Sequence, residues 1–174
     1  LPRIAPFEDA AISEALAEFL REEGLAIHAG VRIERVAKPN GHYAVTAALD
    51  GRAQRLEAEQ LLVATGRRPN TAGFGLEDAG VTLGERGAAQ VDAFLQTGNP
   101  DVYAAGDVIG RDMFVYVAAY AGTLAAENAL TGSRRAFDTG AMARVTFTDP
   151  QVASAGLTEE QARGLRRLAA EKRS

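Results

Sequence analysis

Two short apolar runs, each followed within two residues by glycine and then a charged residue, constrain the fold of this chain most. Residues 61–64 read Leu-Leu-Val-Ala and lead into Thr-Gly-Arg, and residues 102–105 read Val-Tyr-Ala-Ala and lead into Gly-Asp. Continuous apolar runs of this length are typical of strands buried on both faces. Open α/β sheets bind their ligands beyond the carboxyl ends of such strands. The sequence therefore predicts an α/β fold with a ligand site formed after these two runs.

The first 60 residues predict one helix followed by an antiparallel meander. Apolar residues recur at helical spacing between residues 9 and 23, and Gly24 is placed to cap that helix. Alternating or apolar stretches then predict three strands, and Asn-Gly and Asp-Gly pairs supply the positive φ that tight turns need. The expected strands are 25–28, 31–36 and 43–47, and the turns are Asn40-Gly41 and Asp50-Gly51.

The second half predicts a long loop, a small-residue helix and a further strand and helix. Residues 65–89 are rich in glycine, proline and charge, with a short helix candidate at 76–79, and long loops of this kind often carry function. The expected helix covers 114–130, with Thr131 and Gly132 beyond its end, and a strand begins at 143–147. Thr158 and Gln161 are spaced as in a capping box. We expect the polar end, 163–174, to be frayed or foreign.

The residues after the apolar runs are the candidate site. Gly66 has no side chain, so a planar ligand can approach the backbone beside Thr65, and Arg67 can face an anionic group. Asp107 can accept hydrogen bonds from polyol hydroxyls, and Gly106 leaves room for close approach. Two structural alternatives stay open: an ordinary strand exit with a turn at Pro69-Asn70, and a capping role for Asp107.

The helix that begins near Phe114 strengthens the ligand interpretation. A helix N-terminus carries unpaired N–H groups and partial positive charge, which favour an anionic ligand atom. The backbone amides of Met113, Phe114 and Val115 would supply those donors. For the side chains of Phe114, Tyr116 and Tyr120, we expect core packing.

A glycine-rich stretch at 73–78, Gly-Phe-Gly-Leu-Glu-Asp, begins like a dinucleotide fingerprint. Asp78 stands where the third glycine is needed, and a loop precedes the stretch where a strand is required. We therefore do not expect a phosphate-binding loop there.

Composition excludes several classes of function. The chain has no cysteine, which excludes disulfides, thiolate metal sites and a redox dithiol within it. The net charge of −4 argues against nucleic acid as a partner, because phosphate binding needs a basic excess. No apolar run reaches the roughly 20 residues of a membrane span, and no secretory leader stands at the start. We expect a cytoplasmic protein without a catalytic residue or a metal site of its own.

Four segments resemble the second half of the pyridine nucleotide-disulfide oxidoreductase family, and the mercuric reductase branch in particular. They are Ala-Thr-Gly-Arg-Arg-Pro-Asn at 64–70, the stretch from Thr97 to Asp107, Phe-Val-Tyr-Val-Ala-Ala-Tyr-Ala-Gly at 114–122, and Val-Thr-Phe-Thr-Asp-Pro-Gln-Val-Ala at 145–153. The resemblance implies an FAD/NAD(P)-binding Rossmann-like fold in three layers with an antiparallel meander. It implies that this fold is incomplete here and is followed by the start of an α+β interface domain.

The resemblance also assigns roles to residues. Asp107, with Gly106 beside it, would accept hydrogen bonds from the FAD ribityl chain, and Val115, next to Phe114, would offer its backbone amide near the flavin pyrimidine oxygen. Gly66 and Thr65 would lie against the nicotinamide dinucleotide, with Arg67 as a weaker candidate. The implied domains are the latter part of the NAD(P)-binding domain at 1–58, a returning FAD segment at 59–140, and the start of a dimerisation domain at 141–174.

The implied chemistry belongs to a longer, homodimeric enzyme. It passes electrons from NADPH or NADH to FAD, then to a cysteine pair, and finally to a small molecule or a metal ion such as Hg(II). We expect this chain to be an internal fragment, since neither the cysteines nor the His–Glu pair of other branches is present and His28 and His42 fall in the meander. A dihydrolipoyl dehydrogenase-like enzyme and a non-catalytic remnant stay open, as does the choice between NAD and NADP.

Overall fold

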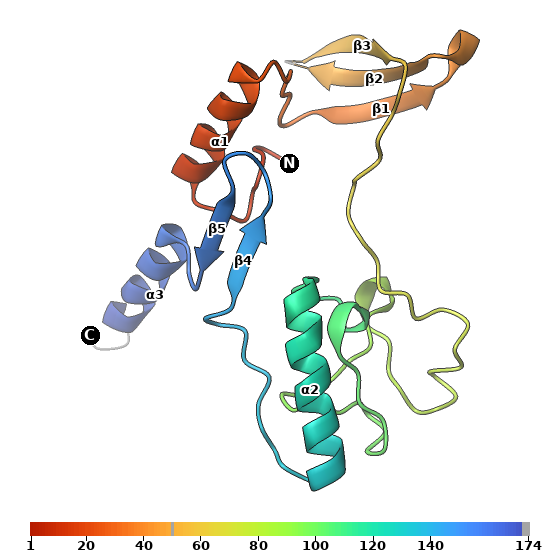
Figure 1. Cartoon of the computed structure of the whole chain (residues 1–174), viewed down its shortest axis with the longest axis vertical. Helices are drawn as coiled ribbons and strands as arrows, with labels where there is room; N and C mark the ends of the chain where they lie inside the picture. The colour runs from red at the N-terminus through yellow and green to blue at the C-terminus, as the bar shows by residue number, and fades with distance from the viewer. Residues whose placement is uncertain (50, 172–174) are drawn as a thin grey trace. The chain divides into compact units, whose positions relative to one another are not determined.

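The computed structural model describes residues 1–49 and 51–171. It is mixed α/β and divides into two compact units, the first built from Leu1–Ala64 with the residues from Val145 on, and the second from Thr65–Arg144. Figure 1 shows the strands β1 to β3 as one antiparallel meander. The expected α/β class with an antiparallel meander is therefore confirmed.

Helix α1, Ala10–Glu22, forms where helical spacing predicts it. Leu16 and Ala17 are buried on one face, while most of the other positions are exposed. Gly24 follows the C-cap residue Glu23, and its φ of +92° lets its N–H reach the Arg21 carbonyl and lets Leu25 N–H reach the Leu20 carbonyl. This pair of bonds is a Schellman motif, so the predicted glycine cap is confirmed.

The meander consists of β1, Arg32–Ala37, β2, Tyr43–Leu49, and β3, Arg52–Ala58. Both pairings are antiparallel, with Val36 opposite Val45 and Val45 opposite Leu56. The Asn40-Gly41 turn is confirmed by positive φ at both residues, whereas Asp50 of the second predicted turn lies outside the described residues. Only the central strand β2 contributes buried side chains, at Ala44, Ala47 and Leu49.

Two expectations about this sheet were wrong. Residues 25–28 are not a strand, because the chain leaves the α1 cap there and turns again at Gly30, which has a φ of +71°. Strand β3 was missed, because every residue of its Arg-Ala-Gln-Arg-Leu-Glu-Ala sequence is exposed and it has no alternation of buried apolar residues. Its formation depends on pairing with β2.

The apolar run at 61–64 is not a buried strand. Leu62 is 89% exposed and Val63 is 68% exposed, and within the described part of the chain no strand pairs with them. An all-apolar strand is stable only when neighbouring strands satisfy its backbone and cover both faces. Those neighbours are not supplied by the described residues.

The second unit is organised around helix α2, Val115–Thr131, as predicted. The helix ends at Gly132, which has a φ of +66° and donates its N–H to the Asn128 carbonyl. Its inner face packs against loop residues rather than against a sheet. The buried members of this core cluster are Leu95, Ile109, Val117, Ala121, Leu124, Ala125 and Phe137.

The second apolar run, 102–105, is also not a full strand. It makes one isolated antiparallel bridge, between Gln96 and Tyr103, and Thr97 closes the intervening turn by donating its hydroxyl to the Val102 carbonyl at 2.9 Å. The short helix expected at 76–79 is a series of turns. Short-range backbone hydrogen bonds thus replace the regular strand predicted at 102–105 and the regular helix predicted at 76–79.

The chain continues through β4, Ala143–Thr146, β5, Val152–Ala155, and α3, Glu159–Glu171. Strand β4 confirms the strand expected at 143–147. The capping box is confirmed, since Thr158 N–H donates to the Gln161 side chain and Gln161 N–H donates to the Thr158 hydroxyl. The expectation of fraying from residue 163 was wrong as far as Glu171, and residues 172–174 lie outside the described residues.

Candidate functional site

Arg67 brings together three segments of the second unit. Its Nη1 donates a hydrogen bond of 2.6 Å to the carbonyl oxygen of Met113, 46 residues further along the chain. The same nitrogen lies 3.8 Å from Oδ2 of Asp107. The residues after the two apolar runs and those before α2 therefore lie close together, although the runs themselves are not strands.

Asp107 lies in a 3-10 turn, η3, that covers Gly106–Ile109. About half of its side chain is exposed, so the carboxylate is open to a ligand hydroxyl while it faces Arg67. Gly106 has a φ of +80°, and a Cβ there would stand 3.1 Å from the Cβ of Ala118 in α2. The glycine thus lets η3 pack closely against α2, which gives a packing reason for a residue that the sequence associated with ligand approach.

The N-terminus of α2 has no side-chain cap. Phe114 occupies the N-cap position with extended backbone, and its side chain makes no capping hydrogen bond. Val115, the first helical residue, is 84% exposed. The first-turn N–H groups of a helix have no partner within the helix, so an exposed end without a side-chain cap favours an external acceptor or anion.

Thr65 and Gly66 lie in exposed, extended chain immediately before Arg67. Gly66 has a φ of +117°, a conformation that residues with a side chain rarely adopt, and no atom lies within 4 Å of a Cβ built on it. The need for glycine here is conformational, and the space beside it is open. Arg67 links this segment to Met113 and Asp107, and a Cβ built on Gly110 would lie 3.6 Å from Cγ of Pro69 in the same segment.

The aromatic residues of α2 pack as expected. Phe114 and Tyr116 stack with ring centroids 5.4 Å apart, and Tyr120 lies 5.6 Å from the ring of Phe137. All three α2 aromatics contact the core cluster. The Tyr116 hydroxyl is buried and has no hydrogen-bond partner among the described residues. No local sequence pattern predicted this.

The glycine-rich stretch at 73–78 lies in a series of turns. Ala79 N–H donates to the Gly75 carbonyl and Val81 N–H donates to the Leu76 carbonyl. These bonds close the turns between Gly75 and Val81.

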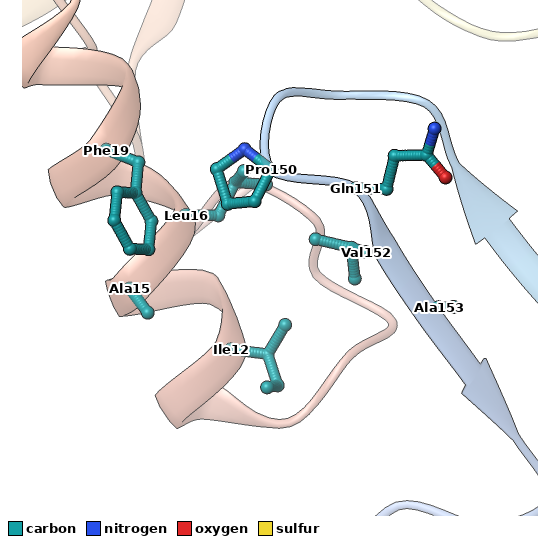
Figure 2. Close-up of a pocket in the computed structure, with 8 residues that line it drawn as sticks. All are labelled: Ile12, Ala15, Leu16, Phe19, Pro150, Gln151, Val152 and Ala153. Carbon is teal, nitrogen blue, oxygen red and sulfur yellow. The ribbon is translucent and has the colours of Figure 1, made fainter.

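A separate apolar hollow of about 220 Å³ lies in the first unit (Figure 2). It is bordered by α1 and by the chain that enters β5, and Phe19, Leu16 and Val152 are among its lining residues. No titratable side chain lines it, so it offers neither an acid nor a base for catalysis. The full lining set is Ile12, Ala15, Leu16, Phe19, Pro150, Gln151, Val152 and Ala153.

Asn128 is a buried polar residue that the sequence did not single out. Its side-chain amide donates to the carbonyls of Phe94 and Arg135, and its oxygen accepts from Ser133 Oγ and Arg135 N–H. These bonds fasten the end of α2 to the segments on either side of it. Among the described helices, none combines the length and the apolar character needed to cross a membrane.

Comparison with protein families gives a match over most of the chain. The model for pyridine nucleotide-disulphide oxidoreductases matches residues 1–122. Mercuric reductase of Streptomyces lividans is 47% identical over 160 residues, which cover 91% of this chain and 34% of that protein. Mercuric reductase of Staphylococcus aureus is 45% identical over 155 residues, covering 89% of this chain and 28% of its own length.

Other relatives have different names. Dihydrolipoyl dehydrogenase of Mycobacterium leprae is 39% identical over 165 residues. Among solved structures, the HOCl-induced flavoprotein disulfide reductase RclA of Escherichia coli matches 92% of this chain with a TM-score of 0.80 and 32% identity. LpdA of Mycobacterium tuberculosis matches with a TM-score of 0.82 and 30% identity. The chain spans about a third of the length of these relatives.

Proposed function

The chain belongs to the pyridine nucleotide-disulfide oxidoreductase family, and we propose that it forms the part of such an enzyme that holds the ribityl and pyrimidine portions of FAD. The observation that carries this proposal is the proximity of Asp107, Arg67 and the loop before α2. FAD bound there would supply the two-electron redox chemistry that nicotinamide cofactors and thiols require.

The described residues fit the cofactor. The exposed Asp107 carboxylate is an acceptor for ribityl hydroxyls. Gly106 lets η3, the turn that carries Asp107, pack closely against α2. The N–H of Val115 would be a donor for a pyrimidine oxygen, whereas the N–H of Phe114, which the sequence also offered, already bonds the Asp112 carbonyl. The partial positive charge at this helix end favours negative charge on an acceptor that lies close to the Val115 amide.

The residues before Arg67 are proposed to contact the nicotinamide nucleotide. Gly66 offers open backbone, and Thr65 offers a hydroxyl beside it. NAD and NADP are both compatible with these residues, since neither position distinguishes the 2′-phosphate. The corresponding proposed domains are an NAD(P)-binding segment at 1–58, an FAD segment at 59–140 and the start of a homodimer interface domain at 141–174.

For the longer enzyme, we favour reduction of Hg(II) by a cysteine pair. This rests on the names and identities of the relatives, 47% and 45% for two mercuric reductases against 39% for a dihydrolipoyl dehydrogenase. Thiolates are soft ligands that suit a soft metal ion as substrate. The chain itself contains no cysteine, so the sulfur chemistry would lie in other parts of the enzyme.

A dihydrolipoyl dehydrogenase-like activity is the second candidate, because the relative of that name covers 94% of this chain. The two candidates differ in the interface domain, where a cysteine pair would indicate mercury reduction and a His–Glu pair would indicate lipoamide chemistry. Sequencing the coding region on both sides of this chain decides between them. A His–Glu pair there would overturn the mercury proposal.

The FAD proposal is tested by titrating FAD into the purified chain and following backbone amide signals by NMR. We expect saturable shifts at Asp107 and at Val115 and Tyr116, which weaken in Asp107→Asn. Asp101→Asn is the matched control, because Asp101 is an exposed carboxylate of the same segment. Equal effects of the two substitutions, or no shifts at these amides, would overturn the proposal.

A further inference from the structure

The loop that leads into α2, residues 110–114, contains strained backbone. Asp112 has a φ of +46° without being glycine, Gly110 has a φ of +73°, and Phe114 N–H bonds the Asp112 carbonyl only two residues back. Left-handed conformations cost free energy for residues with a Cβ. Contacts from outside the loop are needed to hold such a segment in one conformation.

Thr139 and Arg67 donate side-chain hydrogen bonds to this loop, and Arg111 of the loop lies over the Phe137 ring, 5.0 Å from its centroid. Thr139 donates its hydroxyl to Oδ2 of Asp112 at 3.0 Å, near the middle of the loop. Arg67 donates to the Met113 carbonyl at 2.6 Å, next to the N-cap residue Phe114. Of the two, the Arg67 bond is the one adjacent to the start of α2.

The two contacts of Arg67 are unequal. The 2.6 Å bond to Met113 is a charge-assisted hydrogen bond, whereas the 3.8 Å separation from Asp107 is too long for one. Both side chains of the ion pair are at least half exposed, so solvent screens their attraction. The carbonyl of Met113 is therefore the main anchor, and the Asp107 carboxylate is left available.

The Arg67 guanidinium lies close to the start of α2, and this position indicates which part of the structure it stabilises. A cation beside a helix N-terminus is unfavourable with respect to the helix dipole. Arg67 nevertheless lies there, bonded to the carbonyl that precedes the helix, so its contribution is to the loop and not to the charge of the helix end.

We propose that Arg67 is a positioning residue that fixes the 110–114 loop, and through it the first-turn amides of α2, in the orientation that accepts the cofactor. This role rests on the proposed function, but it acts on the protein backbone and does not require Arg67 to touch the nicotinamide nucleotide. Ligand hydroxyls would bind Asp107 without displacing Arg67 from Met113.

The test is amide hydrogen exchange of the loop and of the α2 N-terminus in the full chain, with and without FAD. Arg67→Gln is expected to speed exchange at Phe114 and Ala118, whose N–H groups bond the carbonyls of Asp112 and Phe114, about tenfold, the change that loss of one hydrogen bond from a charged donor produces. Arg68→Gln removes the same charge one residue later and is expected to leave these amides unchanged. Arg67→Lys keeps a donor cation and is expected to restore part of the protection.

The Asp107→Asn variant distinguishes an effect on the conformation of the loop from an effect on FAD binding. It should leave loop exchange in the free chain unchanged while it weakens the FAD-induced shifts, whereas Arg67→Gln should alter both. If Arg67→Gln does not fold, as judged by its tyrosine near-UV circular dichroism, Arg67→Lys takes its place, and the prediction is faster loop exchange than in the wild-type chain. Unchanged exchange in the folded Arg67 variant, or equal acceleration in Arg68→Gln, overturns the inference. If Arg67→Gln speeds loop exchange but the wild-type chain shows no FAD-induced shifts, the proposed function is contradicted and the role of Arg67 in holding the loop is still supported.

Discussion

The meander and the α2 core cluster differ in how far regular backbone hydrogen bonding goes together with burial of side chains. Strand β3 is paired with β2 along its length, and β1 is paired with β2 except at a register shift between Ile33 and Arg35, yet nearly all of their side chains are exposed. In the second unit, Leu95 lies in a loop with a φ of +67° and is 0% exposed, packed against α2. Regular pairing in the meander thus goes with little burial, whereas the core cluster combines the regular helix α2 with irregular chain.

The difference indicates where stability and where ligand binding are concentrated. Apolar burial is the main favourable contribution to folding, so the core cluster around α2 should dominate the stability of the second unit. The candidate site lies on the same unit and is formed by loops fixed to that helix. Three of the four tyrosines, Tyr103, Tyr116 and Tyr120, lie in this unit, so near-UV circular dichroism reports mainly on it.

The largest expected effect comes from shortening a buried side chain of α2. Leu124→Ala should lower the free energy of unfolding of the second unit by about 2 to 5 kcal/mol, because it removes apolar contacts and leaves a cavity. Leu130→Ala in the same helix is the control, since Leu130 is exposed and its loss should cost less than about 0.5 kcal/mol. Urea unfolding followed by tyrosine dichroism measures both, and similar costs would contradict the assignment of the core.

A polar residue should matter almost as much. Asn128→Ala removes four hydrogen bonds and leaves the Phe94 and Arg135 carbonyls without their side-chain donor, for an expected loss of about 2 to 3 kcal/mol. Ser133→Ala removes only one of these bonds and should cost about 1 kcal/mol or less. Equal losses in the two variants, measured by the same unfolding experiment, would argue that Asn128 is not the centre of the network.

Close packing of the loops against one another gives the next effect. Gly110→Ala would place a Cβ 2.7 Å from the Cβ of Ala88, whose neighbour Ala89 is held by a bond from its N–H to the Val108 carbonyl. We expect a loss of about 2 kcal/mol from overpacking together with the left-handed conformation. Gly132→Ala has a similar φ in open space and should cost only about 1 kcal/mol. Urea unfolding of the two variants measures the difference, and a value near zero would mean that the loop shifts freely to admit the methyl group.

The sequence predicted what depends on local pattern. Helix α1 with its Gly24 cap, helix α2 and the Thr158–Gln161 capping box all follow from spacing over a few residues, and all are present. The Asn40-Gly41 turn follows in the same way.

What the sequence did not predict depends on distant partners. The apolar runs at 61–64 and 102–105 read as strands but become strands only if other chain segments pair with them. Strand β3 exists because β2 lies beside it, although all of its own residues are exposed. For the site, Asp107 and the α2 N-terminus were recognisable as motifs, whereas the bond from Arg67 to Met113 joins residues 46 positions apart and has no local signal.

The smallest effect is expected in the meander. Leu56 of β3 lies opposite Val45 of β2, and its side chain is 42% exposed. Leu56→Ala therefore removes a cross-strand contact worth less than about 1 kcal/mol. Amide exchange of β2 and β3 measures it directly, with Leu62→Ala, in unpaired chain, as the control that should leave the sheet amides unchanged. A loss as large as that of Leu124→Ala would mean that apolar burial, and not backbone pairing with β2, holds β3 in place, and the contrast between the two regions would disappear.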